Sequence, residues 1–267
     1  IDATAFGGGV YGSDGYGEPR LERSTGNPAT TWSLDTFGQN LVACSSSDGK
    51  IYQWTLSTST IAAQVTNAPV GNAGIMVTDE RFLFALGAAG NPRKVQWCDR
   101  ENNTLWTPAA TNEAGSIELQ TVGRIQCGVK VQNQALILTT TDAHTATYSG
   151  PPYVYGIERV GTSCGIVSAQ GVSVVDAGAF WMGKESFFMY SGGTVKELEC
   201  DVADYLYSDI NVSQMAKVVA VSNAKFSEIR WFYPSDDNTE NNRYVSFNYQ
   251  ENTWTIGQLA RTAGVDA

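Results

Sequence analysis

Short apolar or alternating segments, rich in Val, Ile, Phe, Tyr and Trp, recur along the chain between clusters of Gly, Asn, Asp and Ser. Such alternation is typical of β-strands with one buried face, and the polar clusters are typical of turns. One clear example covers residues 40–44, turns at Ser47-Asp48-Gly49 and returns through residues 51–56. The Asp-Gly pair favours a hairpin, because Gly adopts a positive φ without steric cost. The pattern predicts an all-β chain.

Five units of this kind follow one another along the chain. They cover residues 40–56, 73–97, 128–148, 172–198 and 218–257. Their spacing of about 40 to 50 residues is typical of the blades of a β-propeller. We therefore predict a β-propeller of about five to six blades of short antiparallel strands. A β-sandwich with a similar number of strands remains an alternative.

Two segments depart from the strand pattern. Residues 202–207 are predicted to form a short helix between the fourth and fifth units, with Asp201 as its N-cap. Residues 1–30 are rich in Gly, and such a tract gains order only from contacts outside itself. We predict an N-terminal arm at residues 1–30 and a propeller domain at residues 31–267. The arm residues expected to touch a neighbouring subunit are Gly7, Gly8, Gly9 and Tyr11.

The composition argues against several classes of protein. The net charge is −10, whereas tight DNA binding requires Lys and Arg to replace counterions, so we expect DNA to slide past this protein. No apolar run approaches the roughly 18 residues of a membrane span, and no export signal is visible, so we expect a soluble chain without membrane insertion. The five cysteines are scattered without a Cys-x-x-Cys pair, which predicts free thiols and no zinc site.

Two segments match the sequence patterns of enzyme motifs but lack the surrounding residues and elements that those motifs require. Residues 161–165 fit the nucleophile elbow G-x-S-x-G, but the elbow needs a histidine later in the chain, and the only histidine, His144, precedes it. Residues 7–12 fit G-x-G-x-x-G, but no apolar strand precedes them and no helix follows. Asp142 and His144 can share one face of a strand, and we interpret His144 as a structural or interface residue. The sequence predicts no catalytic residue, no metal, no cofactor and a non-enzymatic protein.

An acidic segment lies between two strands of the fifth unit. Asp236, Asp237 and Glu240 offer oxygen ligands, but the glycine that bends a calcium loop is missing. Turn chemistry favours a solvated hairpin tip. We expect these three residues to face a partner or a channel.

Particular segments resemble the tail proteins of tailed bacteriophages, most closely the tail hub or nozzle proteins of short-tailed phages, also called packaged-DNA stabilisation proteins. The first is NPRKVQWCDRENNTLWTP at residues 91–108. The others are GSIELQ (115–120), ERVGTSCG (158–165), DAGAFWMG (176–183), RWFYPS (230–235), RYVSFNY (243–249) and Trp254. The resemblance covers most of the chain from about Trp32 onward. These segments consist of aromatic and turn residues, so they identify a family without pointing to a reactive group.

The resemblance implies a β-propeller subunit of the virion tail, assembled in the host cytoplasm. Identical subunits, commonly six, would form a ring that lies below the portal and adaptor and continues the DNA channel. The ring would help retain the genome and pass it during ejection, and tail fibres or spikes would attach to it. We add the hypothesis that acidic residues line the lumen of the ring, so that DNA passes without being held.

Two other classes of function remain open. A carbohydrate-binding propeller for host-surface recognition would show clustered, exposed aromatic residues beside carboxylates on one face. A hydrolase of glycans or esters is disfavoured by the single histidine and by the lack of a convincing acid pair.

Overall fold

The computed structural model describes residues 30–264, and within this range the chain forms five antiparallel sheets of four strands each. In every sheet the strands are neighbours in their order along the chain. The first sheet contains β1 (Trp32–Phe37), β2 (Asn40–Ser45), β3 (Ile51–Trp54) and β4 (Ala63–Gln64), and the second contains β5 (Gly74–Val77), β6 (Leu83–Leu86), β7 (Lys94–Trp97) and β8 (Gly115–Glu118).

The remaining three sheets follow the same plan. The third contains β9 (Ile125–Val131), β10 (Gln134–Thr139), β11 (Asp142–Gly150) and β12 (Val154–Thr162). The fourth contains β13 (Val172–Val175), β14 (Gly178–Met182), β15 (Phe187–Ser191) and β16 (Thr194–Leu198). The fifth contains β17 (Val219–Asn223), β18 (Glu228–Tyr233), β19 (Arg243–Asn248) and β20 (Thr253–Gln258).

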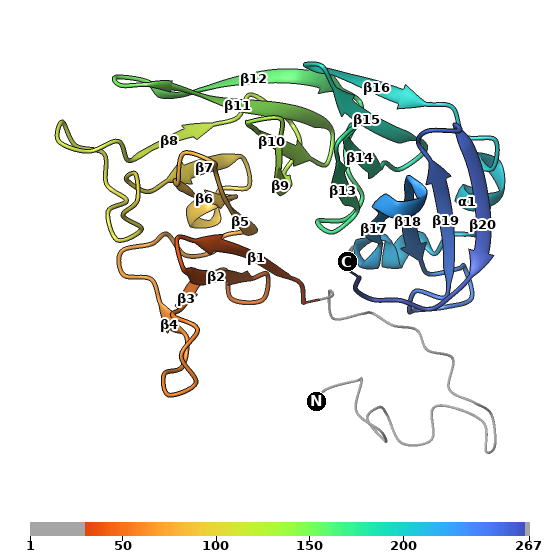
Figure 1. Ribbon diagram of the computed structural model, residues 1–267, viewed down its shortest axis with the longest axis horizontal. Helices are drawn as coiled ribbons and strands as arrows, with labels where there is room; N and C mark the ends of the chain where they lie inside the picture. The colour runs from red at the N-terminus through yellow and green to blue at the C-terminus, as the bar shows by residue number, and fades with distance from the viewer. Residues whose placement is uncertain (1–29, 265–267) are drawn as a thin grey trace.

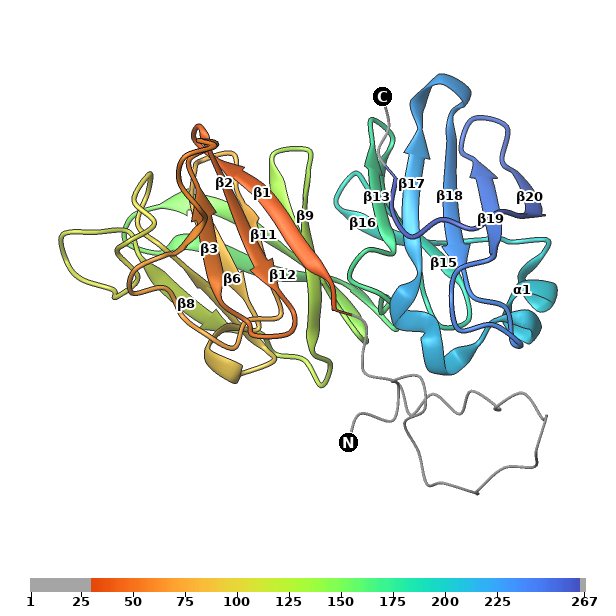
Figure 2. The same cartoon turned by 90° about the horizontal axis from the view of Figure 1, so that it is seen from below.

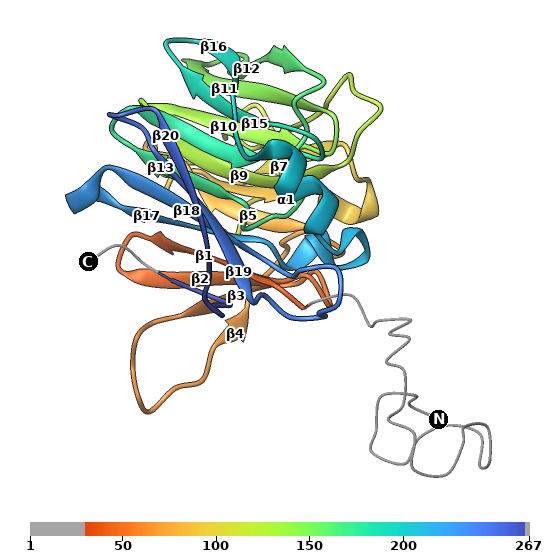
Figure 3. The same cartoon turned by 90° about the vertical axis from the view of Figure 1, so that its right-hand side faces the viewer.

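These sheets are the blades of a β-propeller, and the predicted fold is confirmed. Figure 1 shows them arranged about a common axis, with β1, β5, β9, β13 and β17 as the inner strands. In Figure 3 the first blade lies on the opposite side of the molecule from β11, β12 and β16. Each predicted unit corresponds to one blade, although four strands, β1, β4, β8 and β12, lie outside the predicted segments.

Apolar clusters fill the spaces between successive blades. Val42, Ile51 and Leu83 belong to the cluster between the first two blades, and a second cluster joins blades two and three. Trp181 lies between blades three and four, and Trp231 between blades four and five; both are fully buried. Face-to-face packing of sheets therefore buries most of the apolar residues that alternate along the strands.

The blades approach closely where their connections meet. Gly49, in the predicted Asp-Gly turn, has a φ of +62°, and a Cβ atom there would lie 2.5 Å from the Cα of Gly71. The hydroxyl of Tyr52 donates a hydrogen bond to Asp48 Oδ2 at 2.7 Å, which fixes the same turn. Gly at this position therefore serves both the turn and the contact with the next blade.

One α-helix, α1 (Ala203–Asp209), occurs among the described residues, close to the predicted range of 202–207. Its N-cap position is Val202, without a side-chain cap, so the prediction of Asp201 as N-cap is wrong. Three short 3-10 helices occur at η1 (Ala88–Gly90), η2 (Val212–Lys217) and η3 (Ala224–Phe226). Within the described range, no helix is long and apolar enough to cross a membrane.

The five cysteines, all of which fall in the described range, are free thiols, as predicted: Cys44, Cys98, Cys127, Cys164 and Cys200. Cys44, Cys98 and Cys164 are buried, and the other two are partly buried. Burial raises the pKa of each thiol, to about 11 for Cys44, Cys164 and Cys200 and to about 12 for Cys98 and Cys127. At neutral pH the thiols are therefore protonated and weakly nucleophilic.

The ring of blades is open on one side. Successive inner strands pack beside one another from β1 to β17, but β17 does not pack beside β1 in the same way. Figure 2 looks into this open side, with β1 and β17 on its two flanks. Among the described residues, one face of the first blade therefore has no neighbouring blade.

Candidate functional site

The uncovered face of the first blade is apolar. Leu34 lies opposite Ala43, which lies opposite Tyr52, and directly opposed residues of antiparallel strands share a face. Trp54 lies on the same face, beside Leu41. Leu34 is 61% exposed, whereas the corresponding faces of the other blade interfaces are buried in apolar clusters.

The other face of β1 is tied to the second blade. Ser33 Oγ accepts a hydrogen bond from the backbone N–H of Ile75 at 3.0 Å, and Asp35 Oδ2 accepts one from Val77 at 2.8 Å. Because side chains alternate along a strand, these contacts direct Trp32 and Leu34 toward the open side. The exposure of this face is therefore built into the register of β1.

A shallow apolar groove of about 370 Å³ extends the open face toward its outer edge. It is lined by Leu41, Tyr52 and Trp54 and by the loop at residues 57–62. The indole N–H of Trp54 donates to the backbone oxygens of Ser57 and Thr60, at 3.1 and 3.0 Å, and so holds the loop beside the sheet. Ile61, at the end of this loop next to β4, is 93% exposed.

On the other flank of the open side, the fifth blade is better covered. A Cβ atom on Gly264 would lie 2.7 Å from Val221 of β17, so the C-terminal part of the described chain lies against this blade. Asn241 Nδ2 donates to the backbone oxygens of Lys217 at 2.8 Å and Arg261 at 3.0 Å, which holds the segment in place. Within the described part of the chain, the first-blade flank of the open side is therefore the less covered of the two.

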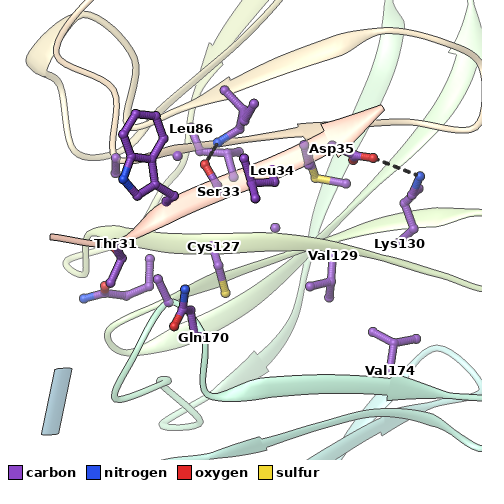
Figure 4. Close-up of a pocket in the computed structure, with 18 residues that line it drawn as sticks. Thr31, Ser33, Leu34, Asp35, Leu86, Cys127, Val129, Lys130, Gln170 and Val174 are labelled. Atoms are coloured by element: carbon purple, nitrogen blue, oxygen red, sulfur yellow. Dashed lines mark hydrogen bonds and ion pairs between the residues drawn. The ribbon is translucent and has the colours of Figure 1, made fainter. Parts of the chain in front are cut away.

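Four of the inner strands, β1, β5, β9 and β13, line an axial cavity of about 380 Å³ (Figure 4). Leu34, Cys127, Val129 and Val174 contribute apolar atoms from β1, β9 and β13. An ion pair crosses the cavity wall, between Lys130 Nζ and Asp35 Oδ1 at 3.7 Å. The pair is charge-balanced, so the axial cavity of a single subunit is not an acidic passage.

A wider hollow of about 720 Å³ lies next to this cavity. Its lining combines hydroxyl, amide and backbone groups with apolar side chains, and Arg124 is its one cation among the described residues. Neither cavity gathers the paired carboxylates or the activated nucleophile that hydrolysis requires. The predicted acidic lumen is the central channel of a ring of several subunits. A single subunit does not show that channel, so the acidic lumen stays a prediction.

The predicted contact residues fall in two places. Asp236, Asp237 and Glu240 lie in the connection between β18 and β19, as the hairpin interpretation requires, and all three are exposed. Lys217 Nζ forms an ion pair with Glu240 at 2.5 Å, and none of the three acidic residues lines the axial cavities. The predicted arm residues Gly7, Gly8, Gly9 and Tyr11 lie outside the described residues. Their partner contacts stay predictions.

The structure brings His144 and Asp142 together, with 3.5 Å between Nε2 and Oδ1, and both are at least 95% buried. Asp142 Oδ1 also accepts hydrogen bonds from the hydroxyls of Thr121 at 2.8 Å and Thr139 at 2.5 Å. His144 Nε2 has no hydrogen-bond partner in the described part of the chain. Burial lowers the pKa of His144, and the charge of Asp142 offsets this only in part.

The G-x-S-x-G segment forms the end of β12 and the start of the connection to β13. Ser163 has a φ of 56° and is exposed, but no helix follows it, so the residue does not stand on a strand-to-helix elbow. Ser163 instead lies in the connection that leads from blade three to blade four. The sequence interpretation missed the open face, although Trp32, Leu34 and Thr36 alternate with polar residues and could have revealed a strand.

Comparison with known proteins gives structural similarity only. No protein-family model and no curated protein sequence matches the chain. Virginiamycin B lyase from Staphylococcus aureus superposes with a TM-score of 0.56 at 10% identity, covering 87% of this chain and 73% of the lyase. A streptogramin B lyase gives 0.53 at 8% identity, covering 86% of this chain and 68% of that one. A putative 6-phosphogluconolactonase from Bacteroides uniformis gives 0.56 at 10%, covering 86% and 71%.

These similarities correct one prediction. The chain was expected to be non-enzymatic because it lacks a histidine-based triad, but the similar structures are named as lyases and a lactonase. The propeller fold and the missing triad are therefore no ground for excluding catalysis. At 10% identity or less the likeness shows the fold alone, and no activity passes from those enzymes to this chain. None of these three structures is named as a phage protein.

Proposed function

We propose that this chain is a structural subunit of a bacteriophage tail, built into a ring that continues the DNA channel below the portal and adaptor. The observation that carries the proposal is the uncovered apolar face of the first blade, with Trp32 49% and Leu34 61% exposed. A contiguous exposed apolar surface on a folded protein is typical of a contact with another macromolecule. A neighbouring subunit would cover this face in the assembled ring.

The family resemblance supports the proposal at the level of the fold. Trp97, Trp106, Trp181 and Trp231 belong to the segments that carry the resemblance, and all are at most 4% exposed. Such residues fill the spaces between blades, so the resemblance concerns the residues of the buried core. The open face and the net charge of −10 support the assembly role. A negative charge suits the wall of a channel through which DNA passes without binding.

The test is quantitative peptide mass spectrometry on gradient-purified virus particles, with copies of this chain counted against the portal protein. A closed axial ring predicts a copy ratio of about one half or one, because ring subunits follow the symmetry of the tail. The same peptides are counted in the crude lysate as a control for expression. A chain that is abundant in the lysate but missing from the particles would overturn the tail proposal.

A further inference from the structure

A second surface feature lies away from the open side, where blades three and four meet. It is a cleft of about 670 Å³, within the range of about 300–1,000 Å³ that small-molecule sites occupy. Its walls come from the turn between β10 and β11, the end of β12, the turn between β14 and β15, and the facing strands β15 and β16. The cleft is therefore built from strand ends and turns of blades three and four.

One buried carboxylate reaches this cleft. Asp142 is 5% exposed and contributes to the lining, and its Oδ1 is occupied by the hydroxyls of Thr121 and Thr139. No hydrogen bond from any described residue reaches Oδ2. The hydroxyl-bearing residues Thr140, Thr162 and Ser163 also line the cleft. An acceptor held rigidly beside hydroxyl groups suits a ligand that donates hydrogen bonds.

Charged side chains of both signs surround this carboxylate. Arg159 and Lys184 line the cleft, and their side chains form no ion pair within the part of the chain that the structure describes. Glu185 and Glu197 lie on the same lining, and the hydroxyl of Ser186 donates to Glu197. With Asp142 the cleft holds three carboxylates against two cations. A strongly anionic ligand is therefore disfavoured, whereas a neutral ligand with many hydroxyls meets donors and acceptors together.

An aromatic ring completes the lining. Phe188 is partly exposed, lies directly opposite Glu197 and packs on Trp181, with ring centroids 5.9 Å apart and an interplanar angle of 29°. The buried indole fixes the orientation of the Phe188 ring. An oriented aromatic ring provides an apolar platform next to polar groups.

We propose that this cleft binds a neutral saccharide. A sugar hydroxyl donates to one group and accepts from another, and the cleft places carboxylates, Arg159 and Lys184 around one space. The less polar face of a sugar ring would pack on Phe188. The inference goes beyond the tail-ring proposal, since it concerns another surface and needs no assembly.

The experiment is a glycan array that holds neutral hexose and N-acetylhexosamine oligosaccharides beside sialylated and uronate-containing ones, probed with the labelled full chain. The best neutral glycan is then titrated by isothermal calorimetry against the wild type and two lysine variants. Lys184→Gln removes a cleft cation, whereas Lys196→Gln removes a lysine from the same blade that the cleft does not include. Phe188→Leu removes the aromatic platform, and thermal melting verifies that each variant is folded.

The expected result is saturable binding of a neutral glycan that falls about ten-fold or more in Lys184→Gln, because hydrogen bonds to charged groups contribute more than neutral ones. Phe188→Leu should weaken binding as well, and Lys196→Gln should not. No neutral signal on the array, a preference for acidic glycans, or equal loss in both lysine variants would each overturn the proposal. None of these results bears on the count of copies in virus particles.

Discussion

At the scale of single residues, the His144 ring carries one of the buried polar atoms that lack a hydrogen-bond partner among the described residues. Its neighbour Asp142 is held by two hydroxyls, whereas His144 Nε2 is buried without a hydrogen-bond partner among the described residues. Burial disfavours the charged imidazolium, and the nearby Arg159 acts in the same direction. The folded protein therefore keeps His144 neutral, and its pKa lies below the ordinary value of 6.5.

This lowered pKa predicts a pH dependence of stability. Below pH 6.5 the unfolded chain takes up a proton on His144 more readily than the folded chain does, so the free energy of unfolding falls as pH decreases toward the folded pKa. His144 is the only histidine, so no other histidine contributes to this slope. Urea unfolding between about pH 7.5 and 5.5 measures it. The slope should become smaller in His144→Gln, and identical slopes in the two proteins would contradict the argument.

At the scale of the blade, a glycine lets the chain that leaves blade three lie directly against a turn of the same blade. A Cβ atom on Gly165 would lie 2.0 Å from the backbone oxygen of Thr140, so the chain after β12 touches the turn between β10 and β11 directly. Gly165→Ala should lower the free energy of unfolding by about 1–3 kcal/mol, because neither backbone segment can yield without shifting a blade. Denaturant unfolding measures the loss.

Gly156→Ala is the matched control for that substitution. Gly156 lies on β12, is exposed, and has no atom within 4 Å of an added Cβ. Its replacement should leave stability within about 1 kcal/mol of the wild type. If both variants lost the same free energy of unfolding, the loss would come from replacing any glycine in this region. The close backbone contact at Gly165 would then not be its cause.

The strands differ in how well the sequence reveals them. All eight strands of blades four and five fall in the predicted units to within one residue, and the middle strands of these units contribute runs of apolar residues to the buried clusters. In contrast, β4 has only the two exposed residues Ala63 and Gln64, and β8 is largely exposed, so neither carries an apolar pattern. In these two strands too few residues are buried for a hydrophobic alternation to appear in the sequence.

The surroundings of Asp142 and the open face were harder to predict than the strands, because both depend on how separate segments pack together. The contact between Asp142 and His144 follows from the two-residue period of a strand, and the sequence indicated it. The hydroxyls of Thr121 and Thr139 reach Asp142 from outside β11, so they depend on how the segments pack. The open face is likewise a property of the whole ring, because the sequence of the first blade does not say whether another blade covers it.

At the scale of the whole molecule, the five described blades form an arc, and the apolar flank on the first blade has no partner among residues 30–264. The similar solved structures are longer, since this chain covers 68–73% of the two lyases. Those propellers contain chain that these five blades do not match. A β-rich partner with an apolar face is therefore the kind of neighbour that would complete the interior packing of the first blade.

The open face predicts a separation between folding and assembly. Leu34→Asp places a charge at a position whose side chain is 61% exposed in the subunit. The free energy of unfolding should therefore stay within about 0.5 kcal/mol of the wild type. A covering neighbour would instead bury an unpaired carboxylate, which is strongly unfavourable.

The control is Val212→Asp. Val212 is 71% exposed and lies in η2, which precedes the fifth blade. Copies per virus particle, counted against the portal, should fall several-fold for Leu34→Asp alone. Equal incorporation of both variants would mean that this face stays uncovered in the particle, and the assembly role would lose the observation on which it depends.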